Sequence, residues 1–378
     1  MTSPADLIIN WDVARATASR LVPPGPPLRP AAAAQEVADL RRAAAEAVGY
    51  VHTITGLSAA EGLGEDQRDV LVVDRPGWST ANTESFRRLL TPALEAVAEK
   101  KPQLVSEGSS AQVVGSAATG AELGGILAFL SANVLGQFDP FHSSERAPAG
   151  RLMLVAPNIV EIAQQLNVDR DDFRLWVCLH EQTHRVQFAA APWLREHLMS
   201  SISTLSASTL SGVESLPQRI AEAVKSLRQE AKQDRAGQHD DAPAAPARNR
   251  LLEALQSPED RAIMSHLTAV MSLLEGHANV VMDAVDASIV PTVKTIRRRF
   301  EQRGKNRSPL EKLVRKLLQL DAKAAQYRDG QKFVGHIVDT VGMETFNTIW
   351  ESPEHLPTEH ELHNPDKWIE RMGFTPQG

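Results

Sequence analysis

The pentapeptide His180-Glu181-Gln182-Thr183-His184 combines metal-binding and acid–base side chains at helical spacing. Residues four apart lie one above the other on the same face of a helix, so His180 and His184 can bind one metal ion. Glu181 then lies where it can act as the general base for a water molecule beside the metal. This spacing predicts the zinc-binding and catalytic segment of a metallohydrolase. The alternative is a pair of exposed histidines on an ordinary amphipathic helix.

The residues around the pentapeptide favour a buried helix, which would hold the metal ligands rigidly. The preceding run contains neither Gly nor Pro, and Asp171 or Asp172 can cap the start of a helix. Pro192 ends or kinks it, so we expect a helix over roughly 171–190. Cys178 falls inside this helix and is expected to be a buried structural thiol. An apolar stripe that would bury the helix is formed by Phe173, Trp176, Val177 and Leu179.

A catalytic zinc ion usually has three protein ligands and a water molecule, so a third ligand is needed. The best candidate is Glu275, which lies with Gly276 in the apolar segment 271–283. A glycine there suggests close approach of the metal-binding helix. His277 is the competitor, but it lies roughly 200° around the helix from Glu275, so both are not expected to bind one metal. Asn279 and Asp283 continue the Glu275 face; either could hydrogen-bond a ligand histidine, or both could simply be polar residues facing solvent or capping the helix.

Composition indicates a soluble, mainly α-helical chain. Of the 378 residues, 42% are apolar, which is enough for a sizeable core, and aromatic residues are scarce. The net charge of −7 argues against a general nucleic-acid partner. The single cysteine excludes an internal disulfide framework and, with the lack of a secretory signal at residues 1–10, predicts a cytoplasmic protein. We expect one domain over 1–378, with a flexible loop at about 231–248.

Other segments predict the surroundings of the site. Residues 151–158 form a plausible strand beside the metal-binding helix, and an exposed edge there could bind a peptide as an added strand. Residues 117–138 are read as one buried helix rather than a membrane span. Residues 201–215 could form a lid or an irregular helix. Residues 294–316 contain ten Lys or Arg and are read as a solvated helix face, with a phosphate-binding patch as the alternative.

The sequence resembles the actinobacterial zincin-like metallopeptidase type 2 family, whose members are associated with deazaflavin coenzyme biosynthesis. The resemblance implies a zincin-like, largely helical fold with a small β element beside the active-site helix. It also implies a metal site at His180 and His184 with Glu275 as third ligand. Tyr327 lies in a resembling stretch and is the leading candidate to donate a hydrogen bond to the oxyanion, ahead of His277 and His336. The resemblance is carried by residues 155–160, 175–188, 274–278 and 326–330, and by the shorter stretches 10–12, 74–78 and 364–368.

These observations together predict a zinc-dependent hydrolase acting on a peptide or a small amide. It would be a peptidase or an amidohydrolase, with Glu181 as general base and zinc as cofactor. The alternative is a non-catalytic binding protein built on the same scaffold. A third, remote possibility is a hydrolase or chelatase for a small coenzyme precursor, which rests on the family association alone.

Overall fold

The computed structural model describes residues 3–65, 70–100, 102, 109–142, 150–211, 257–305 and 320–376. Within its helices, the side chains of 111, 207–211, 304–305 and 320–328 are outside the description. The predicted flexible loop at 231–248 also lies outside the described residues. The predicted lid at 201–215 is helical as far as Ser211.

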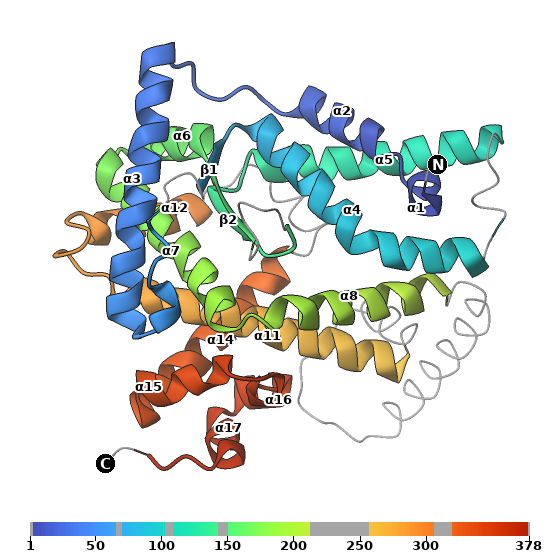
Figure 1. Ribbon diagram of the computed structural model, residues 1–378. Helices are drawn as coiled ribbons and strands as arrows, with labels where there is room; N and C mark the ends of the chain where they lie inside the picture. The colour runs from blue at the N-terminus through green and yellow to red at the C-terminus, as the bar shows by residue number, and fades with distance from the viewer. Residues whose placement is uncertain are drawn as a thin grey trace, which may run out of the picture.

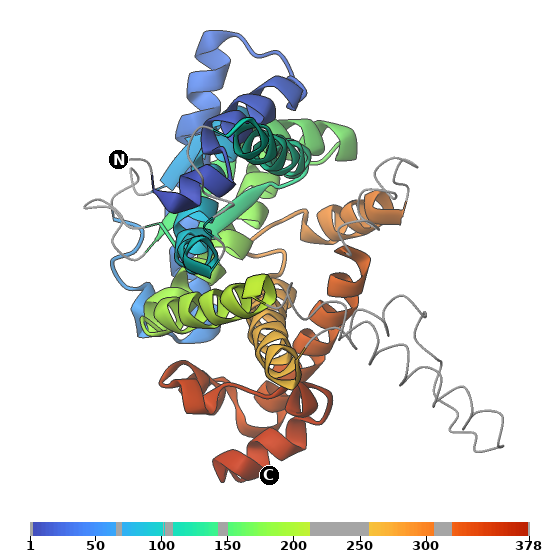
Figure 2. The same cartoon turned by 90° about the vertical axis from the view of Figure 1, so that its right-hand side faces the viewer.

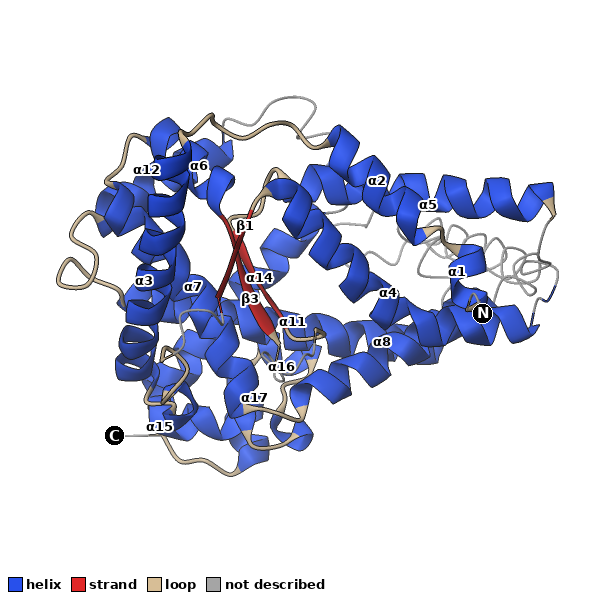
Figure 3. Ribbon diagram, turned by 45° about the horizontal axis from the view of Figure 1, so that its top comes forward, coloured by secondary structure: helices blue, strands red, loops and turns tan. Residues whose placement is uncertain are grey.

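Helices make up most of the described chain, and a small sheet lies among them (Figures 1 and 3). The prediction of a mainly α-helical fold with a small β element is therefore confirmed. The N-terminal half contains α1 (Pro4–Ile8), α2 (Trp11–Leu21), α3 (Pro30–Thr55), η1 (Ser58–Ala60), β1 (Val70–Val73), α4 (Arg75–Lys100), α5 (Ser110–Ser131), β2 (Gly136–Asp139), β3 (Arg151–Val155), α6 (Ala156–Leu166), α7 (Arg170–Ala190) and α8 (Leu194–Ser211).

In the described C-terminal part every secondary-structure element is a helix. The elements are α11 (Pro258–Ala284), α12 (Val293–Lys305), α14 (Leu320–Val341), α15 (Met343–Phe346), η5 (Asn347–Trp350), η6 (Pro353–His355), α16 (Glu359–His363) and α17 (Pro365–Met372). Figure 2 shows the last of these helices, in red, at the opposite end of the molecule from the N-terminal helices, whereas α12, in orange, lies to one side.

The three strands are ordered β1-β3-β2, so the strand predicted at 151–158 is the central one. It pairs in parallel with β1, Val70 opposite Leu152, and antiparallel with β2, Gly136 opposite Leu154. Because both of its edges are occupied, β3 cannot accept a peptide, and the expectation of an exposed edge there is wrong. The strand also ends at Val155, where α6 begins. The strand edge next to α7 belongs to β2.

The apolar segment expected as one buried helix over 117–138 is divided differently. Helix α5 ends at Ser131, and β2 follows it. Gly120 and Gly124 bring α5 into backbone contact with α2, as close packing of small residues predicts, but Val114 on the helix is 67% exposed. Within the described part of the chain, residues 112–131 are the one helix with the length and hydropathy of a membrane span, and 28% of that window is buried.

Helix α7 has the predicted extent, but a different residue caps it. Asp169 accepts hydrogen bonds from the backbone N–H groups of Asp171 (2.9 Å) and Asp172 (3.0 Å). The carboxylate of Asp172 instead accepts hydrogen bonds from the backbone N–H (2.7 Å) and the hydroxyl (2.6 Å) of Thr292. Cys178 is fully buried, and burial raises the pKa of its thiol, which fits the predicted structural role.

The basic segment is only partly the solvated face that its composition suggests. Arg297 donates to the carbonyl oxygens of Met282 and Val285 at the end of α11. Arg299 donates to Leu166 and Asn167 at the end of α6. Free carbonyls at a helix C-terminus attract cations, so these two guanidinium groups stabilise the ends of the neighbouring helices. Residues 306–316 lie outside the described residues.

Candidate metal centre

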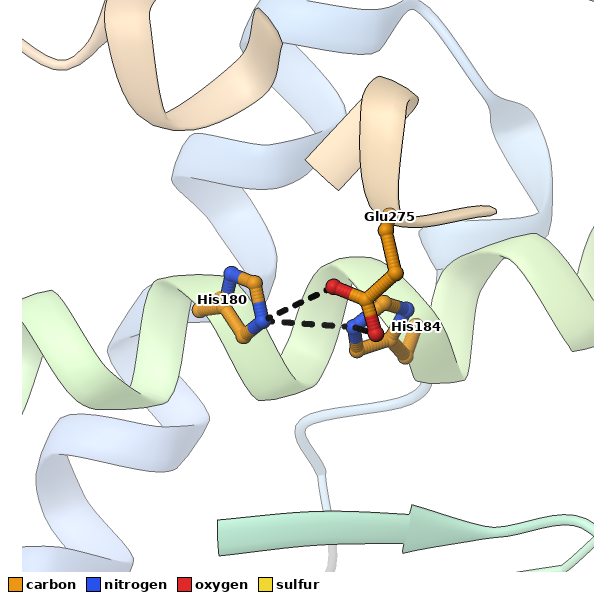
Figure 4. A group of neighbouring side chains, drawn as sticks. All are labelled: His180, His184 and Glu275. Carbon is orange, nitrogen blue, oxygen red and sulfur yellow. Dashed lines mark hydrogen bonds and ion pairs between the residues drawn. The ribbon is translucent and has the colours of Figure 1, made fainter. Parts of the chain in front are cut away.

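Three side chains from two helices meet at one point beside the sheet (Figure 4). His180 and His184 come from α7, and Glu275 comes from α11. The two Nε2 atoms lie 3.3 Å apart. Each Nε2 is 3.9 Å from an oxygen of the Glu275 carboxylate. One ligand atom from each residue can be chosen so that all three lie within 4.8 Å of one another.

This geometry and donor set fit zinc. Two ligands bound about 2.0–2.1 Å from a tetrahedral zinc ion lie about 3.3 Å apart, which is the separation of the two histidine nitrogens. Burial, and then the charge of His184, lowers the pKa of His180 to about 3. A neutral imidazole is the form that binds a metal. Within the described residues this is the one cluster of three such ligands.

Gln187 holds His184 in the orientation that a metal ligand needs. Its Oε1 lies 3.0 Å from His184 Nδ1, so it accepts the N–H there and leaves the Nε2 lone pair free. Its Nε2 donates to the carbonyl oxygen of Leu274 at 2.8 Å and to Nδ1 of His277 at 3.0 Å. Gln187 is fully buried and thus joins α7 to the helix that carries Glu275.

Sequence reasoning missed Gln187, although its place one turn after a ligand histidine was a usable signal. It offered Asn279 or Asp283 for the orienting role, with solvent-facing or capping residues as the alternative, and the structure shows neither bonded to a ligand histidine. Asp283 instead accepts a hydrogen bond from Gln331 at 2.6 Å, and both residues line a cavity beside the site.

His277, two residues after Glu275 on α11, is not part of the cluster of three ligand groups. It is fully buried, stacks on Phe346 with ring centroids 5.4 Å apart, and faces Trp350 at 5.3 Å. Burial lowers its pKa to about 3, with a smaller contribution from His184. The Gln187 amide occupies its Nδ1. His277 is therefore placed to support the site through Gln187, and Glu275 is the α11 residue that faces the two histidines.

Glu181 lies against the edge strand. A Cβ atom added at Gly136 would come within 2.6 Å of Glu181 Cγ and 2.8 Å of its carboxyl carbon, so β2 needs glycine here. The residue is 8% exposed, and burial, followed by the nearby charge of Glu275, raises its pKa to about 8. Sequence reasoning gave no sign that a glycine some forty-five residues upstream would lie against the proposed base.

Gly276, beside Glu275, allows close packing with a different helix from the one expected. A Cβ atom on Gly276 would collide with the backbone of Gly330 in α14, and one on Gly330 would collide with the carbonyl of Ser272. The two glycines thus allow α11 and α14 to cross in backbone contact. The expectation that Gly276 makes room for the metal-binding helix is wrong.

Of the proposed oxyanion donors, the two whose side chains are described, His277 and His336, do not lie at the centre. Tyr327 lies in α14, but its side chain is among those outside the description. His336 is 43% exposed and pairs with Asp366 across a 2.7 Å hydrogen bond. Asn279, one turn after Glu275, is a polar side chain that does line the cavity next to Glu181.

Two cavities adjoin the candidate metal centre, and His180 and Glu181 line both. The first has a volume of about 420 Å³ and is bounded by α7, α11, α12 and α14. The second, of about 360 Å³, is bounded by β2, α7, α8 and α11, and His184 and Glu275 also line it. The two cavities therefore meet at His180 and Glu181.

Comparison with known proteins agrees with this fold. The family model described as zincin-like metallopeptidase matches residues 9–369, so the chain belongs to the zincin-like metallopeptidase family. It is also similar to a crystal structure from Chloroflexus aurantiacus described as a "putative hydrolase with a novel fold". The two chains share 30% identity with a TM-score of 0.64, over 97% of this chain and 99% of the other. No curated protein matches the sequence.

Proposed function

We propose that this protein is a zinc-dependent peptidase or amidohydrolase in which His180, His184 and Glu275 bind zinc and Glu181 is the general base. One observation carries the proposal. The three ligand groups meet within 4.8 Å, and Glu181 lines the cavities on both sides of them. Membership of a metallopeptidase family supports the same reaction class.

The chain's own residues supply the remaining parts of such a reaction. When bound, zinc lowers the pKa of a water molecule and polarises the substrate carbonyl. Glu181 accepts a proton from that water and delivers it to the leaving amine. Asn279 and Tyr327 are the candidates to donate a hydrogen bond to the oxyanion.

The edge strand suggests how an extended substrate would bind. The edge of β2 that is not paired with β3 lies next to α7, and Gly136 in this strand contacts Glu181. A peptide added alongside β2 by main-chain hydrogen bonds would bring its amide to the proposed base. A peptide or small amide as substrate, no nucleic-acid or membrane partner, and a cytoplasmic location remain predictions.

Metal analysis and four substitutions test the assignment. Elemental analysis is expected to find about one zinc per chain, lost in His180→Ala and Glu275→Ala. His336→Ala is the matched control, because this histidine pairs with Asp366 away from the centre and should retain zinc. Glu181→Gln should keep the metal but lose turnover of a peptide library. Full activity in that variant would refute the base assignment; a zinc-loaded wild type that cleaves nothing would favour the non-catalytic binding protein.

A further inference from the structure

The cavity between β2 and the helices α7, α8 and α11 has a distinct chemical character. Its volume is about 360 Å³. Helix α8 lies alongside α11 (Figure 1), and residues from both helices line the cavity. The apolar residues that line it come from all of these elements and from the turn after β2: Phe138, Pro140, Phe141, Phe188, Leu198, Met271 and Leu274.

The two cavities differ in the charge of the residues that line them. Among the described residues that line the first, Glu181 and Glu275 are the only charged ones, and none is Lys or Arg. The cavity on the other side of the centre is lined by polar and charged groups from α11, α12 and α14, namely Asn279, Asp283, Arg297, Glu301 and Gln331, together with aromatic residues. The first cavity therefore favours an uncharged apolar group, because an anionic group there would face two carboxylates.

Most of the apolar residues in the cavity wall are held by core packing, whereas one at its opening is exposed and flexible. The rings of Phe138 and Phe188 pack against each other with centroids 5.5 Å apart. Leu198 and Leu274 are each 3% exposed and fixed in the core, whereas Met271 is 42% exposed. Methionine is unbranched and flexible, so at the rim it can pack on groups of different shapes.

We propose that this cavity binds a large apolar side chain, aromatic or branched aliphatic, on the substrate residue next to the scissile amide. The inference rests on the proposed function, since it places the substrate amide at His180, His184 and Glu275. The cavity begins at these ligands, and its volume is ample for one such side chain and typical of small-molecule sites. The substrate class is thus a peptide or acyl amide with a hydrophobic residue at one defined position.

Binding of two hydroxamates tests the proposal without requiring turnover. Both probes chelate zinc, and they differ in one group: phenylacetohydroxamate carries a phenyl ring on the methyl carbon of acetohydroxamate. On the zinc-loaded full chain, calorimetry should show the phenyl probe binding roughly tenfold to a hundredfold tighter, because the ring is buried in the apolar cavity. Met271→Glu should abolish most of this ratio. Met264→Glu is the matched control, since Met264 is 40% exposed on the same helix and does not line the cavity.

The possible outcomes distinguish failure of this inference from failure of the proposed function on which it rests. Equal affinity for the two probes, with zinc bound, would overturn the cavity assignment and leave the zinc site intact. Failure of both probes on zinc-loaded protein would overturn the proposed function and this inference with it. If the cavity instead binds a second copy of the chain, Met271→Glu would lower the molar mass measured by light scattering and leave the probe ratio unchanged, which also refutes the proposal.

Discussion

Replacing Gln187 with Met should weaken zinc binding although Gln187 is not itself a ligand. The methionine side chain has nearly the same length and volume, so the packing of α7 on α11 is preserved. What is lost is the acceptor for His184 Nδ1 and the donor to His277 Nδ1, each at 3.0 Å. The hydrogen bond from Gln187 to the Leu274 carbonyl is also lost, but this matters less because the carbonyl still accepts a hydrogen bond within α11.

The expected losses of stability and of zinc affinity follow from these two hydrogen bonds. A buried polar group left without its partner costs about 1–3 kcal/mol. Losing both partners should therefore lower the free energy of unfolding by about 2–6 kcal/mol. The lower end is expected, because the His184 side chain is 14% exposed and can reach water. Without Gln187 the imidazole is free to rotate and to change tautomer. Loss of such an orienting partner typically costs about 10- to 100-fold in metal affinity.

The assay is a competition titration of zinc against a chromophoric chelator, with chemical unfolding of the zinc-free protein measured in parallel. Gln182→Met is the matched control. Gln182 is equally buried on the same helix, but it donates to the carbonyl of Ala44 at 2.8 Å, away from the candidate ligands. The control should lose stability and keep its zinc affinity. Equal zinc affinity in Gln187→Met and the wild type would refute the orienting role.

Three further substitutions have defined outcomes. Gly136→Ala places a methyl group against the proposed base and should lower turnover by about 100-fold with zinc content unchanged; unaltered turnover would contradict the contact. Gly330→Ala forces α14 away from α11 and should destabilise the protein by about 1–3 kcal/mol in urea unfolding, whereas Gly335→Ala, with open space around it, should stabilise it slightly. Burial lowers the pKa of both His197 and His266, whose Nε2 atoms lie 2.6 Å apart. The unfolded chain therefore binds protons first as the pH falls, and stability is lost below about pH 6.5. His266→Gln should show a smaller drop in melting temperature between pH 7.5 and 5.5, and an unchanged drop would count against the pair.

The local pattern of residues was sufficient to predict the metal-binding helix. Spacing of four puts His180 and His184 on one face of any α-helix, whatever surrounds it. The absence of Gly and Pro over 171–179 and the apolar stripe placed that helix at 171–190, close to the Arg170–Ala190 observed. Scarce aromatic residues and abundant Ala and Leu likewise indicated a mainly helical chain. These features depend on backbone geometry and on neighbours within a few residues.

Only the tertiary structure determines which residues each helix face contacts. The sequence left Glu275 and His277 as alternatives on opposite faces of one helix, and only the packing of α11 on α7 turns Glu275 toward the two histidines. The link from Gln187 to His277 and the contact of Gly136 with Glu181 join residues 90 and 45 positions apart. A hydrophobic pattern fixes which face of an element is buried but does not name the partner, because any apolar face of suitable shape satisfies it. The partners, and with them the complete site, come from the assembled fold.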